Sequence, residues 1–160
     1  MLKTFLFIMI LFFTGCTVKK VVVSEPYIIT IKSKKFRFSD YAILEKYSNK
    51  EVKIKVFNTG VLVKEIIIDD KICSDEGCLS KKEFNNLYLS KFYPPGLLKN
   101  VVLGKPIFNS ENLIKKNSGF IQKIYRKNSL DIIYKVYKDS VYFKDRINKI
   151  LIKIKKMKGN

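Results

Sequence analysis

Histidine and tryptophan are both absent from this sequence of 160 residues. Because histidine is the commonest general base and the commonest metal ligand, its absence removes Ser-His-Asp and Cys-His catalytic arrangements. The 7 glycines are dispersed along the chain, so they form no glycine-rich phosphate loop. Adjacent carboxylates occur at Asp69-Asp70 and Asp75-Glu76, but the first pair reads as a solvated turn after an apolar strand. We therefore expect no enzymatic activity, no metal and no bound cofactor.

The apolar run near the N-terminus is too short to cross a bilayer, which takes about 20 residues. Lys3 supplies a positive charge, Phe5 to Phe13 are uninterrupted Phe, Leu, Ile and Met, and Thr14-Gly15 lead to Cys16. A charge, a short apolar core and a small-residue cleavage site, in that order, are typical of a secretory signal peptide. A buried N-terminal helix with a chance cysteine is the alternative.

Residues 13–16, Phe-Thr-Gly-Cys, resemble the lipobox of bacterial lipoproteins. The resemblance implies cleavage before Cys16, diacylglycerol on its sulfur and acylation of the new amine. Two or more acyl chains hold a protein stably on a membrane surface without spanning it. In enterobacterial lipoproteins an Asp after the cysteine favours the inner membrane. Thr17 stands there in this chain, so the resemblance implies an outer-membrane address facing the periplasm.

These features divide the chain into three parts. Residues 1–15 are the expected signal peptide, residues 16–26 a lipidated tether that ends at a proline, and residues 27–158 one β-rich domain. The last part is long enough for a single hydrophobic core, and we expect a monomer.

Acidic residues are scarce, with 14 Asp and Glu against 32 Lys and Arg, which gives a formal net charge of +18. Such a charge can indicate nucleic-acid binding, but the basic residues are scattered and an exported protein rarely meets nucleic acid. A Lys near anionic lipid headgroups contributes roughly 1 kcal/mol to membrane binding. Lys19-Lys20 and residues 153–158 are the densest basic segments, so we expect a membrane as partner and no nucleic acid.

Two further cysteines flank the short segment Ser-Asp-Glu-Gly. In an oxidising compartment Cys73 and Cys78 can close a small disulfide loop that staples a hairpin tip or a strand-to-helix connection. A redox or metal pair is the alternative. The spacing differs from the two-residue gap of redox motifs, and no other thiol or imidazole completes a metal site. The pattern favours the structural staple.

Alternating apolar and charged residues predict antiparallel strands through most of the domain. Val52, Ile54 and Val56 alternate with Lys53 and Lys55 over residues 51–57. Comparable patterns predict strands at 27–31, 36–38, 41–44, 61–68, 120–126, 130–137, 141–143 and 147–155, whereas residues 109–118 read as a loop.

The middle of the chain has a helical pattern. Residues 80–83 have the spacing of a capping box and predict a helix to about Lys91, and residues 97–103 predict a second short helix. The expected fold class is α+β, mainly β: a curved, half-barrel-like antiparallel sheet covered by one or two helices.

The order of these parts resembles the outer-membrane lipoprotein receptor LolB. Three stretches carry the resemblance: residues 56–62, a strand–loop–strand with an apolar tip; residues 92–106, a proline-containing helical segment that ends in Leu-Gly-Lys-Pro; and residues 120–155, the closing strands. The chain departs from that family in its shorter N-terminus, its lack of tryptophan, and Cys73 and Cys78.

The resemblance implies a function in lipid transfer. An acylated client lipoprotein would arrive from a periplasmic carrier, place its acyl chains in the interior of the half-barrel, and pass into the outer membrane. Val61 and Leu62 would form the membrane-contact tip. The implied acyl-cavity wall is formed by inward-facing residues: Val52, Ile54, Val56, Ile132, Tyr134, Val136, Ile150, Ile152 and Ile154. A lipoprotein with a packed core that binds a partner protein or stabilises the envelope is the alternative.

Overall fold

The computed structural model describes residues 19–158, so the expected signal peptide and Cys16 lie outside the described residues. These residues form one antiparallel sheet of 11 strands, in the order β6-β5-β4-β3-β2-β1-β11-β10-β9-β8-β7. The strands are β1 (Val21–Lys32), β2 (Arg37–Tyr47), β3 (Val52–Asn58), β4 (Val61–Ile68), β5 (Lys71–Ser74), β6 (Gly77–Ser80), β7 (Leu113–Lys116), β8 (Gly119–Arg126), β9 (Leu130–Tyr137), β10 (Ser140–Asp145) and β11 (Ile150–Lys156).

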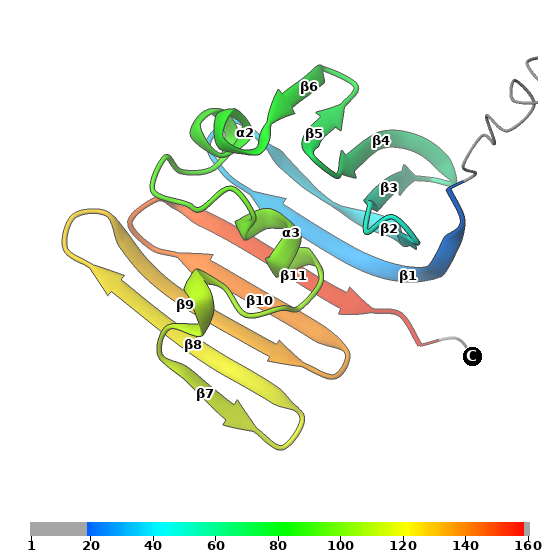
Figure 1. The fold of residues 1–160 in the computed structure, drawn as a ribbon. Helices are drawn as coiled ribbons and strands as arrows, with labels where there is room; N and C mark the ends of the chain where they lie inside the picture. Colours follow the sequence, from blue (N-terminus) through cyan, green and yellow to red (C-terminus); the bar gives the residue numbers. More distant parts are fainter. Residues whose placement is uncertain (1–18, 159–160) are drawn as a thin grey trace, which may run out of the picture.

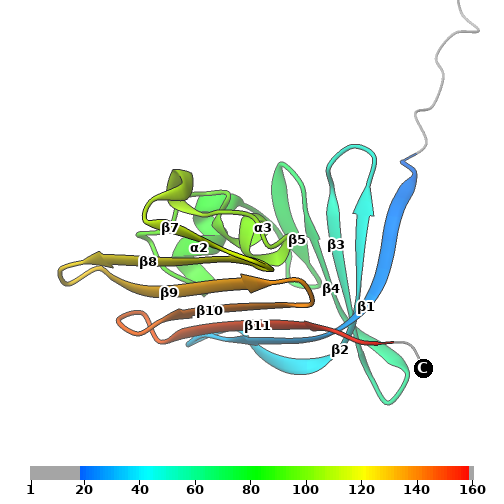
Figure 2. The ribbon, with the colours of Figure 1, turned by 90° about the horizontal axis from the view of Figure 1, so that it is seen from below.

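The sheet consists of two meanders joined at its centre. β1 pairs with β2 on one side and with β11 on the other, so the first and last strands of the domain lie side by side. Between β6 at one edge and β7 at the opposite edge, the chain crosses the concave face as α2 (Lys81–Tyr88), α3 (Leu97–Val102) and the 3₁₀ turn η2 (Phe108–Ser110) (Figure 1). The sheet curves around this cover segment (Figure 2). The predicted fold class, a curved antiparallel sheet covered by helices, is confirmed.

The strand alternation determines which face is covered. In β3, Val52, Ile54 and Val56 are buried, whereas Lys53 and Lys55 lie on the other face. β11 repeats the pattern with Ile150, Ile152 and Ile154. Because neighbouring residues of a strand point to opposite faces, this periodicity gives one apolar concave face and one lysine-rich outer face.

The two helices begin where the sequence indicates. In α2 the capping box is present: Glu83 N donates to Ser80 Oγ at 3.2 Å, and Ser80 N donates to Glu83 Oε2 at 2.9 Å. α2 ends at Tyr88, earlier than expected, because Leu89 leaves helical geometry. α3 follows the Pro-Pro-Gly turn. Gly104, at φ +64°, supplies the left-handed residue just after this helix.

Several strands differ from the expectation. The strands predicted at 36–38 and 41–44 form the single strand β2, and the strand predicted from residue 147 begins at Ile150 as β11. β1 begins at Val21, so residues 21–26 belong to the sheet rather than to a tether. Pro26 has no backbone N–H to donate, but it costs the sheet little at this position. Its carbonyl accepts a hydrogen bond from Met157 N, so the backbone polar groups of Pro26 face β11, near the end of the β1–β11 ladder. No hydrogen bond between β1 and β2 is therefore lost. β7 lies within the segment expected to be a loop, where Leu113 to Lys116 pair with the free edge of β8.

Cys73 and Cys78 form the predicted disulfide, which lies across the β5–β6 hairpin. The two residues face each other in the ladder with a Cα–Cα distance of 4.0 Å, and the turn contains Asp75 and Glu76. The bond therefore staples the short hairpin at the sheet edge from which the chain enters α2. Within residues 19–158, no helix has the length and apolar character needed to cross a membrane.

Replacing Cys73 and Cys78 together by Ser should lower the free energy of unfolding by about 2 kcal/mol, because the bond closes a short loop in the unfolded chain. The melting temperature should fall by roughly 4–8 °C for a domain of this size, measured by thermal unfolding followed by circular dichroism. Adding a reductant to the unmutated protein should produce the same change. Unchanged stability in both experiments would contradict a stabilising role.

Candidate functional site

The concave face brings together all the residues predicted to form an acyl-cavity wall. Ile54 lies opposite Leu44 and Ile66, and Ile152 lies opposite Phe143. Residues that oppose each other in an antiparallel ladder point to the same face, so the wall is continuous across the sheet. Val52, Ile54, Val56, Ile132, Tyr134, Ile150, Ile152 and Ile154 are at most 2% exposed, and Val136 is half-buried against them.

Side chains of the cover segment fill the space above this wall. Beneath α2, the ring of Phe36 packs edge-on against Phe84 and Tyr88, with centroids 6.0 and 5.7 Å away. Beneath α3, the apolar side chains Leu97, Leu98, Val101 and Val102 are buried in the same core. The wall residues are therefore buried in one core with the apolar side chains of the cover.

An opening reaches the wall at the C-terminal end of α3. Its volume is about 280 Å³, and it lies between the end of α3, the β9–β10 turn and the neighbouring ends of β1, β2 and β11. Charged residues surround it, among them Lys46, Lys138 and Asp139. The apolar residues that line it are Leu44, Val102, Leu103, Val136, Val141 and Ile154, of which Val136 and Ile154 belong to the predicted wall.

An ion pair borders the opening. Lys156 donates to Glu25, and so does the hydroxyl of Tyr27. These two hydrogen bonds lower the pKa of Glu25 below its usual range. Glu25 therefore stays charged at neutral pH, and the rim beside the apolar lining is zwitterionic.

Buried polar contacts attach the cover segment on both sides of α3. Before α3, the Tyr93 hydroxyl donates to Asp145 Oδ2 at 2.9 Å, and burial together with this carboxylate raises the pKa of Tyr93. After α3, Gln122 holds the backbone of Ile107: Ile107 N donates to Gln122 Oε1 at 2.9 Å, and Gln122 Nε2 donates to Ile107 O at 3.0 Å. The Tyr134 hydroxyl donates to Lys105 O at 2.9 Å, and burial raises the pKa of Tyr134.

The sequence analysis did not single out Gln122 or Asp145, although the sequence carries a signal for both. Each occupies an inward position of an alternating strand, where Ile124 and Phe143 are their apolar neighbours on the same face. A polar residue at an inward, otherwise apolar position of a strand indicates a buried hydrogen-bond partner, because burying a polar group without one destabilises the fold.

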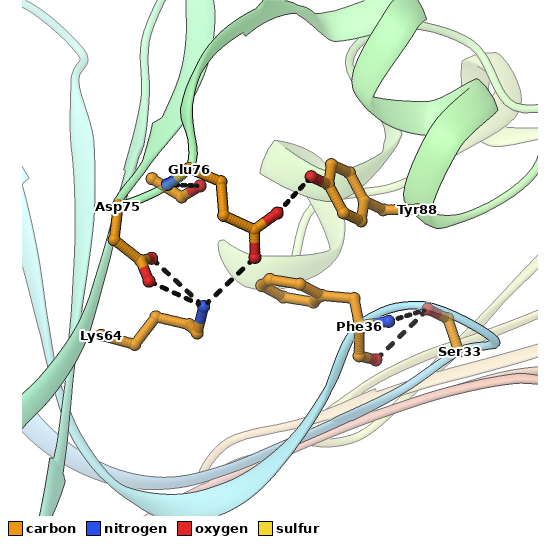
Figure 3. A network of polar contacts seen from close by, with 7 residues as sticks. Ser33, Phe36, Lys64, Asp75, Glu76 and Tyr88 are labelled. Carbon is orange, nitrogen blue, oxygen red and sulfur yellow. Dashed lines mark hydrogen bonds and ion pairs between the residues drawn. The ribbon is translucent and has the colours of Figure 1, made fainter.

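A second polar network links the cover to the sheet on the side of α2 (Figure 3), beside a hollow of about 340 Å³ between α2 and the β5–β6 hairpin. Lys64 Nζ lies 3.1 Å from Asp75 Oδ1, 4.0 Å from Glu76 Oε1 and 5.3 Å from the ring centre of Phe36. The Tyr88 hydroxyl donates to Glu76 Oε2 at 2.6 Å. The hydrogen bond from Lys64 lowers the pKa of Asp75. The carboxylates of the Asp75-Glu76 pair thus connect the stapled hairpin to β4 and α2.

The predicted membrane-contact residues lie at the tip of the β3–β4 hairpin. Val61 is 63% exposed, Leu62 48% and Val63 51%. Val63 was not predicted. It is the extra residue of a bulge, because Val56 pairs with Lys64 whereas Phe57 pairs with Leu62. Three consecutive apolar side chains therefore project into solvent at this tip.

Comparison of the sequence with protein-family models and with curated proteins found no match. Within residues 19–158, no cluster of three or more His, Cys, Asp or Glu side chains could hold a metal ion. The fold and the site together describe an antiparallel half-barrel with a helical cover, an opening beside α3 and an exposed apolar hairpin tip.

Replacing Gln122 by Met should destabilise the cover segment, because the buried N–H and C=O of Ile107 would lose their partner. The free energy of unfolding should fall by roughly 2 kcal/mol. Hydrogen exchange at residues 105–111 should accelerate more than exchange in β3. Lys123→Met is the matched control, because Lys123 is exposed on the outer face of the same strand. Equal effects of the two substitutions would contradict the role given to Gln122.

Proposed function

We propose that this protein is a lipid-anchored lipoprotein of a bacterial envelope, similar to LolB, that accepts the acyl chains of client lipoproteins and passes them to the outer membrane. The opening beside α3 carries this proposal, because there the apolar wall of the concave face is reached from solvent. The client would be delivered by a soluble periplasmic carrier. No covalent chemistry is required, in keeping with a chain that lacks histidine.

The opening is small, so an acyl chain enters further only by displacing α3 from the wall. α3 buries four apolar side chains, Leu97, Leu98, Val101 and Val102. Burying a Leu or Val side chain contributes roughly 2 kcal/mol, and burying a methylene contributes about 0.8 kcal/mol. On this scale an acyl chain that buries about ten methylenes offsets the loss of the α3 contacts. Exchange between helix and acyl chain is therefore close to balanced, as a transfer protein requires.

The attachments of the cover segment suit this exchange. Hydrogen bonds hold the cover segment to the sheet at Tyr93, before α3, and at Lys105 and Ile107, after it. A segment held at its two ends can move between them without leaving the sheet. On the side of α2, the disulfide hairpin and the Lys64 network oppose a similar movement. Entry beside α3 is the route that these contacts favour.

The anchor of this proposal is Cys16. Because β1 starts at Val21, residues 17–20 separate the expected lipid from the sheet. Ser48 N donates to Lys20 O at 3.0 Å, and Lys19 pairs with Glu51, so the chain joins the domain beside the β2–β3 turn. A short connection of this kind keeps the domain within a few residues' reach of the membrane surface.

A second function is favoured by a specific observation, the near-complete burial of the wall. A lipoprotein with a permanently packed core would bind a partner protein or stabilise the envelope through its surface. This alternative predicts no uptake of hydrocarbon, whereas acyl transfer requires it, so one binding experiment separates the two functions.

The purified protein should bind a fluorescent long-chain fatty acid saturably, measured by titration of the probe's emission. Val136→Phe should weaken binding about tenfold, because the ring occupies the opening and removes roughly 1.4 kcal/mol of contact with the probe. Ile133→Phe is the matched control, because Ile133 lies in the same strand on the outer face. Failure of the unmutated protein to bind the probe would support the packed-core alternative, and equal affinities of the two variants would place binding elsewhere.

Protein purified from bacterial membranes should begin at Cys16 and carry acyl chains, which intact-mass measurement detects. Cys16→Ser should abolish the added mass and leave residues 1–15 attached, because processing requires the lipidated cysteine. A mature protein with a free thiol at Cys16 would refute the anchor and leave the geometry of the half-barrel unaffected.

A further inference from the structure

Four apolar side chains form a row on the outer face of the sheet. In the ladder, Leu62 of β4 lies opposite Phe57 of β3, while Tyr41 of β2 lies opposite both Phe57 and Ile28 of β1. The adjacent residues Ala42, Val56 and Ile29 are buried on the concave face, so the row lies on the other side. We call Ile28, Tyr41, Phe57 and Leu62 the outer strip.

The outer strip is exposed to solvent although it is apolar. Leu62 is 48% exposed, Ile28 41% and Tyr41 37%, and the Tyr41 and Phe57 rings lie side by side with centroids 5.8 Å apart. Next along the sheet, Thr30 and Ser39 are bonded to each other on the same face, and Lys153 lies opposite Thr30. A contiguous row of exposed apolar side chains indicates a contact surface.

The outer strip continues into other features at both ends. At one end Leu62 belongs to the exposed hairpin tip with Val61 and Val63. At the other end Ile28 lies opposite Lys155 and shares a hollow of about 530 Å³ with Met157 and Lys158. The charged residues that line this hollow are one carboxylate, Asp139, and three lysines, Lys155, Lys156 and Lys158, so its net charge is positive. The row therefore runs from an apolar tip to a cationic end.

We propose that the outer strip lies on the surface of an anionic bilayer and that it orients the half-barrel there. The inference rests on the proposed function and on the membrane-contact tip that the sequence resemblance implies, and it extends that contact across four strands. Tyr41 has the amphipathic side chain found at lipid–water interfaces, and the exposed lysines Lys155 and Lys158 supply charge complementary to anionic headgroups.

This orientation brings the opening beside α3 close to the membrane. Lys156, Asp139 and Ser140 line both that opening and the hollow at the end of the outer strip. The rim of the opening is thus continuous with the contact surface. An acyl chain that leaves the concave face would meet the bilayer at this rim, with little exposure to water.

The absence of tryptophan makes the test direct, because a single introduced Trp is the only indole in the chain. The full chain, purified from membranes, is reconstituted as Ile28→Trp, Tyr41→Trp, Leu62→Trp and Tyr125→Trp. The vesicles contain phosphatidylcholine and phosphatidylglycerol, with brominated acyl chains as quencher. Tyr125→Trp is the control, because Tyr125 is 70% exposed in β8, toward the other edge of the sheet.

Trp at positions 28, 41 and 62 should be quenched by brominated lipid and should shift its emission to shorter wavelength, whereas Trp at 125 should do neither. Removing phosphatidylglycerol should reduce quenching at position 28 most, because that residue adjoins Lys155. Quenching at position 62 without quenching at positions 28 and 41 would overturn the proposed membrane contact of the outer strip. Membrane contact by the hairpin tip alone would still be supported. Equal quenching at 125 would overturn the defined orientation.

Quenching at none of the three positions would remove both the outer strip and the tip from the membrane. Binding of the fluorescent fatty acid is measured without vesicles, so that experiment tests the proposed acyl binding independently of membrane contact. A second measurement guards against local distortion by the indole. Adding Ile28→Ser and Tyr41→Ser to the Leu62→Trp variant should reduce quenching of its indole by brominated lipid about twofold, because the acyl anchor stays in place while two apolar contacts with the bilayer are lost. Unchanged quenching of that variant would contradict the proposal.

Discussion

The contact between the apolar concave face and the cover segment is the interaction on which the rest of the structure depends. An antiparallel sheet with alternating strands has one oily face, and water must be excluded from it. In this chain the strands line that face with Ile, Val and Leu side chains. Apolar side chains of α3 and aromatic rings from the region of α2 belong to the same buried core. The curvature of the sheet brings both halves of the face toward the same short segment (Figure 2).

The two halves of the cover are attached differently. The α2 half is connected to the sheet edge by the disulfide hairpin, the Lys64 network and the packing of Phe36. The α3 half is held by apolar contacts, with polar attachments before and after the helix, and it adjoins the opening. Because apolar contacts are not directional, another hydrocarbon can replace them, whereas the geometry of the paired charges and hydrogen bonds is specific. In the proposed function, this difference determines which part of the interior would exchange its contents.

Local patterns were sufficient to predict most of the sheet. β4 and β9 have the predicted bounds, β8 begins one residue earlier than predicted, and β3 is shifted by one residue, because alternation over a whole strand is a strong signal. The same patterns identified the wall, since each of its residues occupies the inward phase of a strand. The capping box and the disulfide were also local, as both depend on residues three to five positions apart.

What the sequence did not reveal depends on contacts between distant segments. β7 is a strand because β8 offers it an edge, and the start of β1 at Val21 depends on its pairing with β2. The partners of Gln122 and Asp145 lie 15 and 52 positions away in the chain. The filled interior is of the same kind: Phe36 enters it from the turn between β1 and β2, and no pattern within that turn shows where its ring will pack.

A filled interior and a function in acyl transfer are physically compatible when the filling is itself exchangeable. An open apolar cavity loses packing contacts and destabilises a small domain, whereas a protein that closes over its own side chains avoids that cost until hydrocarbon arrives. The cost of opening then sets the affinity, and a chain held too tightly could not be released to a bilayer. α3 is short and buries four apolar side chains, whose loss about ten buried methylenes would offset. Competition between this helix and a guest, at the rim nearest the proposed bilayer surface, would permit both uptake and release.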